Sequence, residues 1–173
     1  MIPRASGTAV LAAFLAAPVG AAEYVYMPAT GPTCVDLQPR REFGSWRCPG
    51  PAGYAVTFFD EGNVVSVAFG IAGRERALVE QDLMWQGAGK VFGDKVEWRL
   101  RDGRPFAAII RIWCQDGDDV IEELLVAKVE MAGSCRVGAV DVRRREANVA
   151  ARELADSAVG FRCGRDPPST VGR

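Results

Sequence analysis

Carboxylates are the side chains best suited to chemistry in this chain, because its 173 residues include no histidine. Without histidine, a Ser-His-Asp triad, a papain-like Cys–His pair and a histidine-ligated metal are excluded. General acid–base catalysis would need a carboxylate, a lysine or a thiolate. Glu97, Glu122, Glu123 and Glu130 fall in predicted strands, but no spacing selects two of them as a catalytic pair. We therefore expect a protein that is not an enzyme, with a carboxylate-dependent envelope hydrolase as the alternative.

A polar cluster on two adjacent strands is the first candidate contact surface. Glu97 and Arg99 alternate with apolar residues and so share one face of a predicted strand. The Asp102-Gly103 turn should fold Arg111 of the next strand back beside them. Exposed ion pairs contribute only about 0–1 kcal/mol, so such a cluster indicates ligand contact or solvation rather than stability.

Tryptophans and arginines form two further candidate contact groups. Trp98 and Trp113 lie on adjacent predicted strands, either as an aromatic platform for a sugar or protein or as part of the core. Three consecutive arginines precede a predicted helix, and they are either a solvated run or part of an anion site: Arg143, Arg144 and Arg145.

Neither composition nor motif predicts a metal, a cofactor or a nucleic-acid partner. Lysine plus arginine is 21 and aspartate plus glutamate is 22, so the net charge of −1 attracts no polyanion. The run Asp116-Gly117-Asp118-Asp119 resembles part of a calcium loop but lacks the remaining oxygen ligands. Because aspartate and glycine also favour tight turns, we expect a turn there.

An export leader is predicted for residues 1–22. Arg4 supplies a positive region, Ala9 to Ala17 is apolar but too short to span a bilayer, and Gly20-Ala21-Ala22 suits a signal peptidase. We expect cleavage after Ala22, with Ala21 as the alternative, and a periplasmic or secreted protein without a transmembrane segment. An N-terminal anchor helix is the other interpretation of this segment.

Five cysteines follow the leader, which favours disulfides with one cysteine left over. Cys34 and Cys48 flank a short loop, which a bridge would stabilise by about 3 kcal/mol. A strand from Cys135 would travel about 25 Å and a helix would return about 24 Å, so we expect Cys163 to bond Cys135. Cys114 then lies outside both bridges, as a buried thiol, a reactive thiol or an intermolecular link.

Period-two patterns predict strands over 54–60, 64–69, 95–101, 106–114, 120–131 and 135–142. From Glu146 to Val159, alanines recur at helical spacing. Residues 71–94 are expected to be loop, with at most a short helix from Glu75 to Trp85. The predicted fold is α+β: an antiparallel meander sheet of about five to seven strands, one C-terminal helix packed on one face, and two disulfide staples.

The domain organisation follows from these elements. Residues 1–22 are the secretory signal peptide, 23–53 an irregular proline-rich arm, 54–164 a single α+β domain and 165–173 a flexible tail.

The chain resembles a family of small, uncharacterised exported proteins of alphaproteobacteria. The resemblance rests on residues spread in order along most of the chain after the leader: Gly44-Ser45-Trp46-Arg47-Cys48-Pro49-Gly50, Val96-Glu97-Trp98-Arg99-Leu100, Gly103, Pro105-Phe106-Ala107, Arg111, Cys135, Val137-Gly138, Asp141, Asn148, Ala151-Arg152, Ala155-Asp156 and Phe161-Arg162-Cys163-Gly164. It implies export and shared cysteines but no activity, so it assigns no catalytic residue. Cys114 is not part of the pattern.

These inferences favour an exported, non-catalytic binding domain for an envelope protein or glycan. An inhibitor of a secreted hydrolase is one form of that hypothesis.

Overall fold

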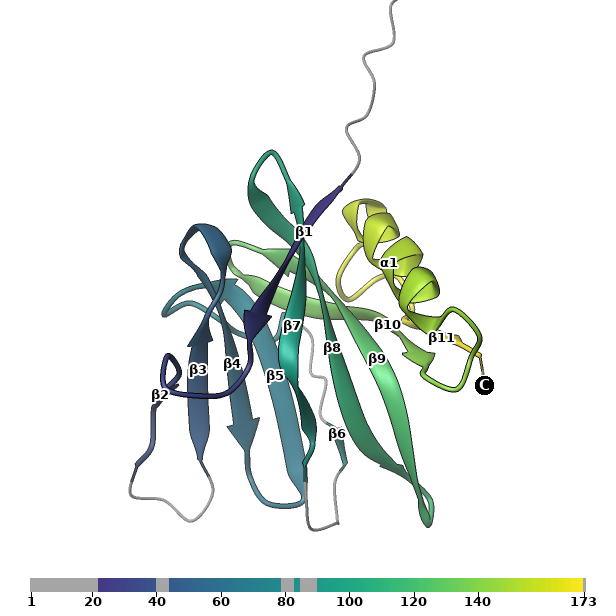
Figure 1. The fold of residues 1–173 in the computed structure, drawn as a ribbon, viewed down its shortest axis with the longest axis horizontal. Coiled ribbons are helices and arrows are strands. Elements are labelled where there is room, and N and C mark those ends of the chain that lie inside the picture. The colour runs from purple at the N-terminus through teal and green to yellow at the C-terminus, as the bar shows by residue number, and fades with distance from the viewer. Residues whose placement is uncertain (1–21, 40–43, 79–82, 85–89, 173) are drawn as a thin grey trace, which may run out of the picture.

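Two β-sheets and one helix form three layers (Figure 1). The computed structural model describes residues 22–39, 44–78, 83–84 and 90–172. The larger sheet contains, in spatial order, β1 (Glu23–Pro28), β7 (Phe92–Arg101), β8 (Arg104–Asp116), β9 (Asp119–Glu130), β10 (Gly133–Asp141) and β11 (Ser169–Val171). The smaller sheet contains β2 (Val35–Asp36), β3 (Ser45–Pro49), β4 (Tyr54–Asp60), β5 (Val64–Ile71) and β6 (Leu83–Met84).

Helix α1 (Ala147–Ser157) continues into a 3₁₀ turn, Ala158–Gly160, and another 3₁₀ turn, Pro51–Gly53, links β3 to β4. Among the described strands, neighbours pair antiparallel except β10 and β11, which are parallel. Within the described residues, no helix has both the length and the apolar character needed to cross a membrane.

An aromatic core fills the space between the two sheets. Phe69 meets the Trp98 ring edge-on at 5.5 Å, and Trp98 is fully buried. On the smaller sheet, Trp46 stacks on Phe58 at 5.0 Å. Gly50 packs so closely on Trp98 that a Cβ there would lie 2.6 Å from the indole ring. Trp98 thus points into the core, on the same face of β7 as the apolar residues Val96 and Leu100, as the strand alternation predicts.

A second core lies between the larger sheet and α1. The alanine stripe of the helix, with Ala151 and Ala155 fully buried, packs on Ala107, Val126 and Val140. Alanine leaves little volume between the helix and the sheet, so the helix can lie close to the strands. The helix therefore covers one face of the sheet, as predicted.

The prediction of a single meander sheet is only partly confirmed. The consecutive strands β7 to β10 do form an antiparallel meander, but β4 and β5 belong to a second sheet, and β10–β11 is parallel. In chain order, β2 to β6 belong to the smaller sheet, whereas β1 and β7 to β11 belong to the larger one. Period-two patterns report which face of a strand is buried, but not which sheet the strand joins.

The predicted arm and tail contain strands. Residues 23–53 include β1, β2 and β3, and residues 165–173 include β11. Val25 and Met27 of β1 pack against the core between the sheets, which orders the strand. The tail can pair with β10 because Gly138 has no side chain where the Ser169 carbonyl approaches. The irregular and flexible interpretations were therefore wrong for these strands.

Two predicted turns are confirmed, whereas two other local predictions are not. β4 and β5 pair as a hairpin, and the Asp102-Gly103 turn joins β7 to β8 with both residues at positive φ. The turn after β8 is shorter than expected, and β9 begins at Asp119. Residues 75–78 and 83–84 are not helical, and the rest of the segment from Glu75 to Trp85 lies outside the described residues.

The structure contains both expected disulfides, Cys34–Cys48 and Cys135–Cys163. The second bridge joins the start of β10 to the segment after α1, as the helix-return argument requires. Cys114 on β8 is buried, and its Sγ lies 3.9 Å from Oε2 of Glu123.

Candidate functional site

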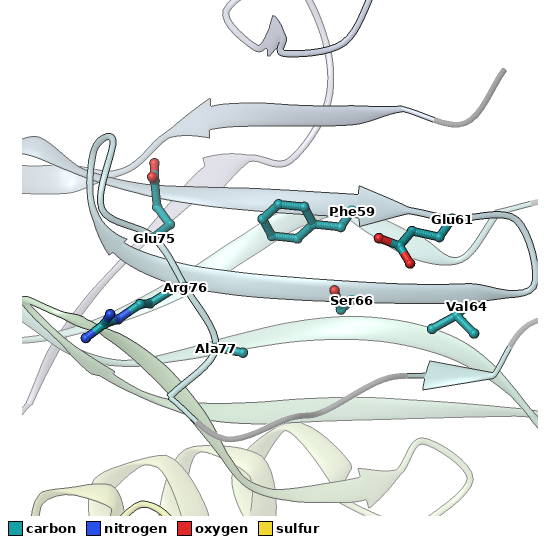
Figure 2. Close-up of a pocket in the computed structure, with 7 residues that line it drawn as sticks. All are labelled: Phe59, Glu61, Val64, Ser66, Glu75, Arg76 and Ala77. Atoms are coloured by element: carbon teal, nitrogen blue, oxygen red, sulfur yellow. The ribbon is translucent and has the colours of Figure 1, made fainter. Parts of the chain in front are cut away.

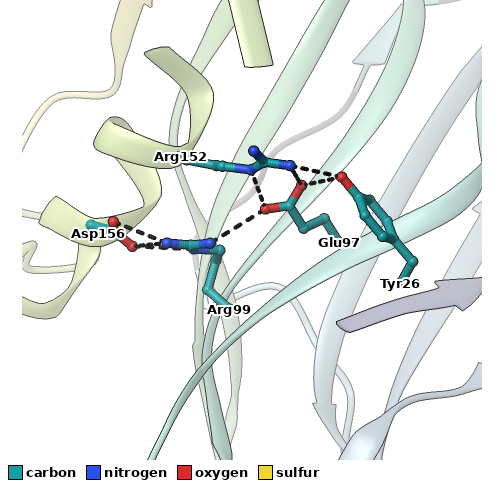
Figure 3. A network of polar contacts seen from close by, with 5 residues as sticks. All are labelled: Tyr26, Glu97, Arg99, Arg152 and Asp156. Carbon is teal, nitrogen blue, oxygen red and sulfur yellow. Dashed lines mark hydrogen bonds and ion pairs between the residues drawn. The ribbon is translucent and has the colours of Figure 1, made fainter. Parts of the chain in front are cut away.

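A polar network connects the edge strand β1, its neighbour β7 and helix α1 (Figure 3). Glu97 of β7 accepts hydrogen bonds from Arg152 Nε (2.8 Å to Oε1) and Nη2 (3.0 Å to Oε2). The Tyr26 hydroxyl donates to Glu97 Oε2 at 2.7 Å, and Arg152 donates to the Tyr26 oxygen at 2.9 Å. Arg99 forms a bidentate pair with Asp156 at 2.8 and 3.0 Å.

Charge in this network is balanced, and its two β7 residues are shielded from water. Glu97 is 6% exposed and Arg99 is 5% exposed. Burial alone would raise the pKa of Glu97, but hydrogen bonds from Arg152 and Tyr26 and the charges of both arginines hold that pKa below its usual value. Burial, followed by the bond to Glu97, raises the pKa of Tyr26. Glu97 is therefore an ionised carboxylate at neutral pH, and Tyr26 is a neutral donor.

Two half-exposed tyrosines of β1 contact this network at the protein surface. Tyr24 is 54% exposed and Tyr26 is 50% exposed, and their rings meet edge-to-face at 5.7 Å. The Arg152 guanidinium carbon lies 4.9 Å from the Tyr24 ring centroid, and that of Arg99 lies 5.9 Å from it. The Tyr26 hydroxyl is held by hydrogen bonds, and the Tyr24 ring contacts both guanidinium groups, so both rings pack against the network. We call Tyr24 and Tyr26 the tyrosine surface.

The predicted cluster of Glu97, Arg99 and Arg111 is only partly formed. Glu97 and Arg99 share a face and interact at 3.5 Å, but α1 covers them, so the expectation of a solvated pair was wrong. Arg111 is exposed and forms an ion pair with Glu122 instead. No contact between Arg111 and the network is seen among the described residues.

The two tryptophans do not form an exposed platform. Trp98 is in the core between the sheets, and Trp113 is partly buried against the same core, with Lys90 Nζ 5.9 Å from its ring centroid. Of the two alternatives predicted for Trp98, an exposed platform or a place in the core, the core is correct.

The arginine run precedes the helix, which begins at Ala147. Arg143 forms a bidentate pair with Asp141, with Nη2 at 2.7 Å from Oδ2. Arg144 and Arg145 are exposed. The run is thus solvated, with one arginine paired, and its role in ligand contact stays a prediction.

A pocket of about 270 Å³ lies on the outer face of the smaller sheet (Figure 2). Seven residues line it: Phe59, Glu61, Val64, Ser66, Glu75, Arg76 and Ala77. Its two carboxylates do not converge, because Figure 2 shows the Phe59 ring between them. Glu75 packs against Gly70 near one end of β4, whereas Glu61 follows the other end.

Buried carboxylates in the described part of the chain form ion pairs with arginines. The Glu75 side chain is 1% exposed and pairs with Arg47 Nε at 2.5 Å. Glu123 lies 3.8 Å from Arg136 Nη2. In that same part of the chain, no cluster of three or more potential ligands could hold a metal ion.

Sequence reasoning missed Tyr24, Tyr26, Arg152 and Asp156 as members of the site. One signal was present: Tyr24 and Tyr26 alternate with Val25 and Met27, which is the pattern of a half-buried strand. A second signal was that Arg152 and Asp156 are spaced four residues apart, off the alanine stripe of the helix.

The fold and this network define the class as a disulfide-bonded β-sandwich with one covering helix. Comparison with known proteins adds no family: no family model, no curated protein and no solved structure matches the chain.

Proposed function

We propose that the protein is an exported, non-catalytic binding domain that contacts an envelope protein or glycan through the tyrosine surface. The observation that carries the proposal is the pair of half-exposed rings, both of which contact the ion network around the buried Glu97. Tyrosine is enriched at binding hot spots because its ring offers a large apolar area. Fixing the rings before binding lowers the entropy cost of association. Sugar rings and apolar side chains both pack on such faces.

Export is supported by the leader pattern of residues 1–22 and by the two disulfides, which form in oxidising compartments. The non-catalytic interpretation is supported by the state of the carboxylates. A general acid at neutral pH needs a raised pKa, whereas Arg152 and Tyr26 hold the pKa of Glu97 low. Glu75 is occupied by Arg47.

The test is binding of the purified protein to peptidoglycan and to outer-membrane proteins from the native envelope. Tyr24→Ala is expected to weaken binding at least about tenfold, which is the loss expected at a hot spot. Val120→Ala is the matched control, since both side chains are 54% exposed and Val120 lies on β9. Equal binding by the two variants would refute the tyrosine surface as the contact. Hydrolysis of a glycan, ester or peptide, abolished by one carboxylate substitution in a folded variant, would favour the hydrolase.

A further inference from the structure

Strand β1 is an open edge of the larger sheet. It lies outermost in the strand order, and within the described residues it pairs with β7 alone. Its outer backbone N–H and C=O groups therefore face away from the sheet and can accept another strand. Figure 1 shows β1 entering the fold at this margin.

The other edges are protected, and β1 is not. β2 and β6 have two residues each, and β11 has three residues preceded by Pro167-Pro168. β1 has six residues, and residues 24–27 contain neither charge nor proline. Natural proteins shorten or charge edge strands, or place proline in them, to prevent pairing. The four residues between Glu23 and Pro28 are therefore the part of the described edges on which pairing is expected.

The sequence of β1 is complementary to itself. When two copies run antiparallel with Val25 opposite Val25, Tyr24 of each copy lies opposite Tyr26 of the other. Directly opposed residues have Cβ atoms about 4.5–5.5 Å apart, which is the distance for aromatic pairing across strands. Glu23, the charged residue of the strand, then faces Met27, so no like charges oppose each other.

The faces also match. A two-fold axis perpendicular to the sheet keeps both α1 helices on one side, and the tyrosines point to that side. Val25 and Met27 point to the opposite side, where each is only partly buried against the core. Pairing would therefore bury apolar side chains on one side and align four tyrosines on the other.

We infer that two copies of this chain pair antiparallel through β1, with Val25 at the two-fold axis, and join their six-stranded sheets into one. The inference rests on the edge and its register and does not depend on the proposed function. It also makes the tyrosine surface twice as large.

Cysteine substitution tests the register directly. Val25→Cys should form a disulfide-linked dimer rapidly with diamide as oxidant, because the two thiols lie opposite each other. Glu23→Cys is the matched control, since the two copies of residue 23 are then about 13 Å apart along the strands. A mixture of Glu23→Cys and Met27→Cys chains should cross-link, because those residues are opposed. Cys114 is present in all variants.

Sedimentation of the unmodified protein across a concentration series should show a monomer–dimer equilibrium, which Val25→Lys should shift to monomer. Cross-linking of Glu23→Cys as fast as Val25→Cys would overturn the register. A mass of one chain at every concentration, together with slow Val25→Cys cross-linking, would overturn the dimer. Binding of an extended peptide along β1 by a protein that stays monomeric would also overturn the dimer, and would indicate that the partner of β1 is a strand from another protein.

Discussion

Glu97 connects three elements that are distant in the sequence. It lies on β7, accepts hydrogen bonds from Arg152 of α1 and Tyr26 of β1, and is almost completely shielded from water. A buried carboxylate is tolerated only when its charge and its lone pairs are satisfied. Removing it should therefore leave cations without their counter-ion, which makes the stability of the protein sensitive to substitution of Glu97.

Glu97→Ala is expected to lower the free energy of unfolding by about 2–4 kcal/mol. Breaking a buried pair costs about 3–5 kcal/mol, and the partial exposure of the Arg152 side chain, 33%, reduces that figure. Thermal unfolding should show a fall in melting temperature of roughly 5–15 °C. Glu130→Ala, an exposed glutamate on β9, is the control and should stay within about 0.5 kcal/mol. A loss no larger than that of the control would show that the network is not structural.

The same carboxylate predicts an acid dependence. Its pKa in the folded protein is below the ordinary 4.5, so the unfolded chain takes up the proton first as the pH falls. The stabilisation by Glu97 is complete above that ordinary value and is lost as the pH falls through the lower folded value. Melting temperatures of the wild type and Glu97→Gln, measured from about pH 7 to about pH 3, should therefore converge at acid pH. A gap that stayed constant over this range would contradict the assignment.

The strand alternation in β7 predicts correctly that Glu97 and Arg99 share a face and that Trp98 takes the other. It could not show whether that face meets water or protein. The partner Arg152 is 55 residues away in the sequence. Local patterns carry no information about which distant element covers a face, so the network appeared as a solvated cluster.

Helix α1 depends on small side chains to lie close to the sheet. Ala151 and Ala155 are fully buried against β8 to β10, and Arg152 follows on the side that faces β7. The alanine stripe in the sequence was sufficient to predict this contact, since spacing and size both pointed to a close helix–sheet packing.

Ala151→Leu is expected to destabilise the protein by about 1–3 kcal/mol, because the added volume has no space beneath the helix. Val149→Leu is the control on the same helix, since Val149 is 47% exposed. Denaturant unfolding measures both. Equal stability of the two variants would mean that the helix can shift outward without loss.

At the scale of the whole molecule, hairpins were predictable and the assembly of sheets was not. The turns at Asp102-Gly103 and after β4 are encoded by neighbouring residues. β1 and β11 join the sheet through partners far along the chain. β1 pairs with residues 95–100, and β11 pairs with residues 138–140. Prolines close to both segments concealed their short strands. The second sheet was missed because a period-two pattern does not report which sheet a strand joins.

We expect the chain to be exported and its mature form to begin at Glu23, which is also the first residue of β1. Cleavage after Ala22 would leave the edge strand complete, with no residue before Glu23. Intact-mass spectrometry of the protein recovered from the periplasm decides the point. Retention of Met1 in a membrane fraction would contradict both the cleavage and the location.

If the chain is exported as proposed, the order of its cysteines has a consequence for their oxidation. A thiol oxidase that joined cysteines as they emerged would make Cys34–Cys48 correctly and would next encounter Cys114 and Cys135. The native second bridge is Cys135–Cys163, so a bond between Cys114 and Cys135 has to be either prevented or later rearranged. In the folded protein Cys114 lies on β8 opposite Ile121 of β9 and is buried in the core between the sheets, which protects it from that bond once β8 and β9 have packed there. Formation of this hairpin before the C-terminus arrives, or help from a disulfide isomerase, is therefore what separates the productive route from a mispaired one.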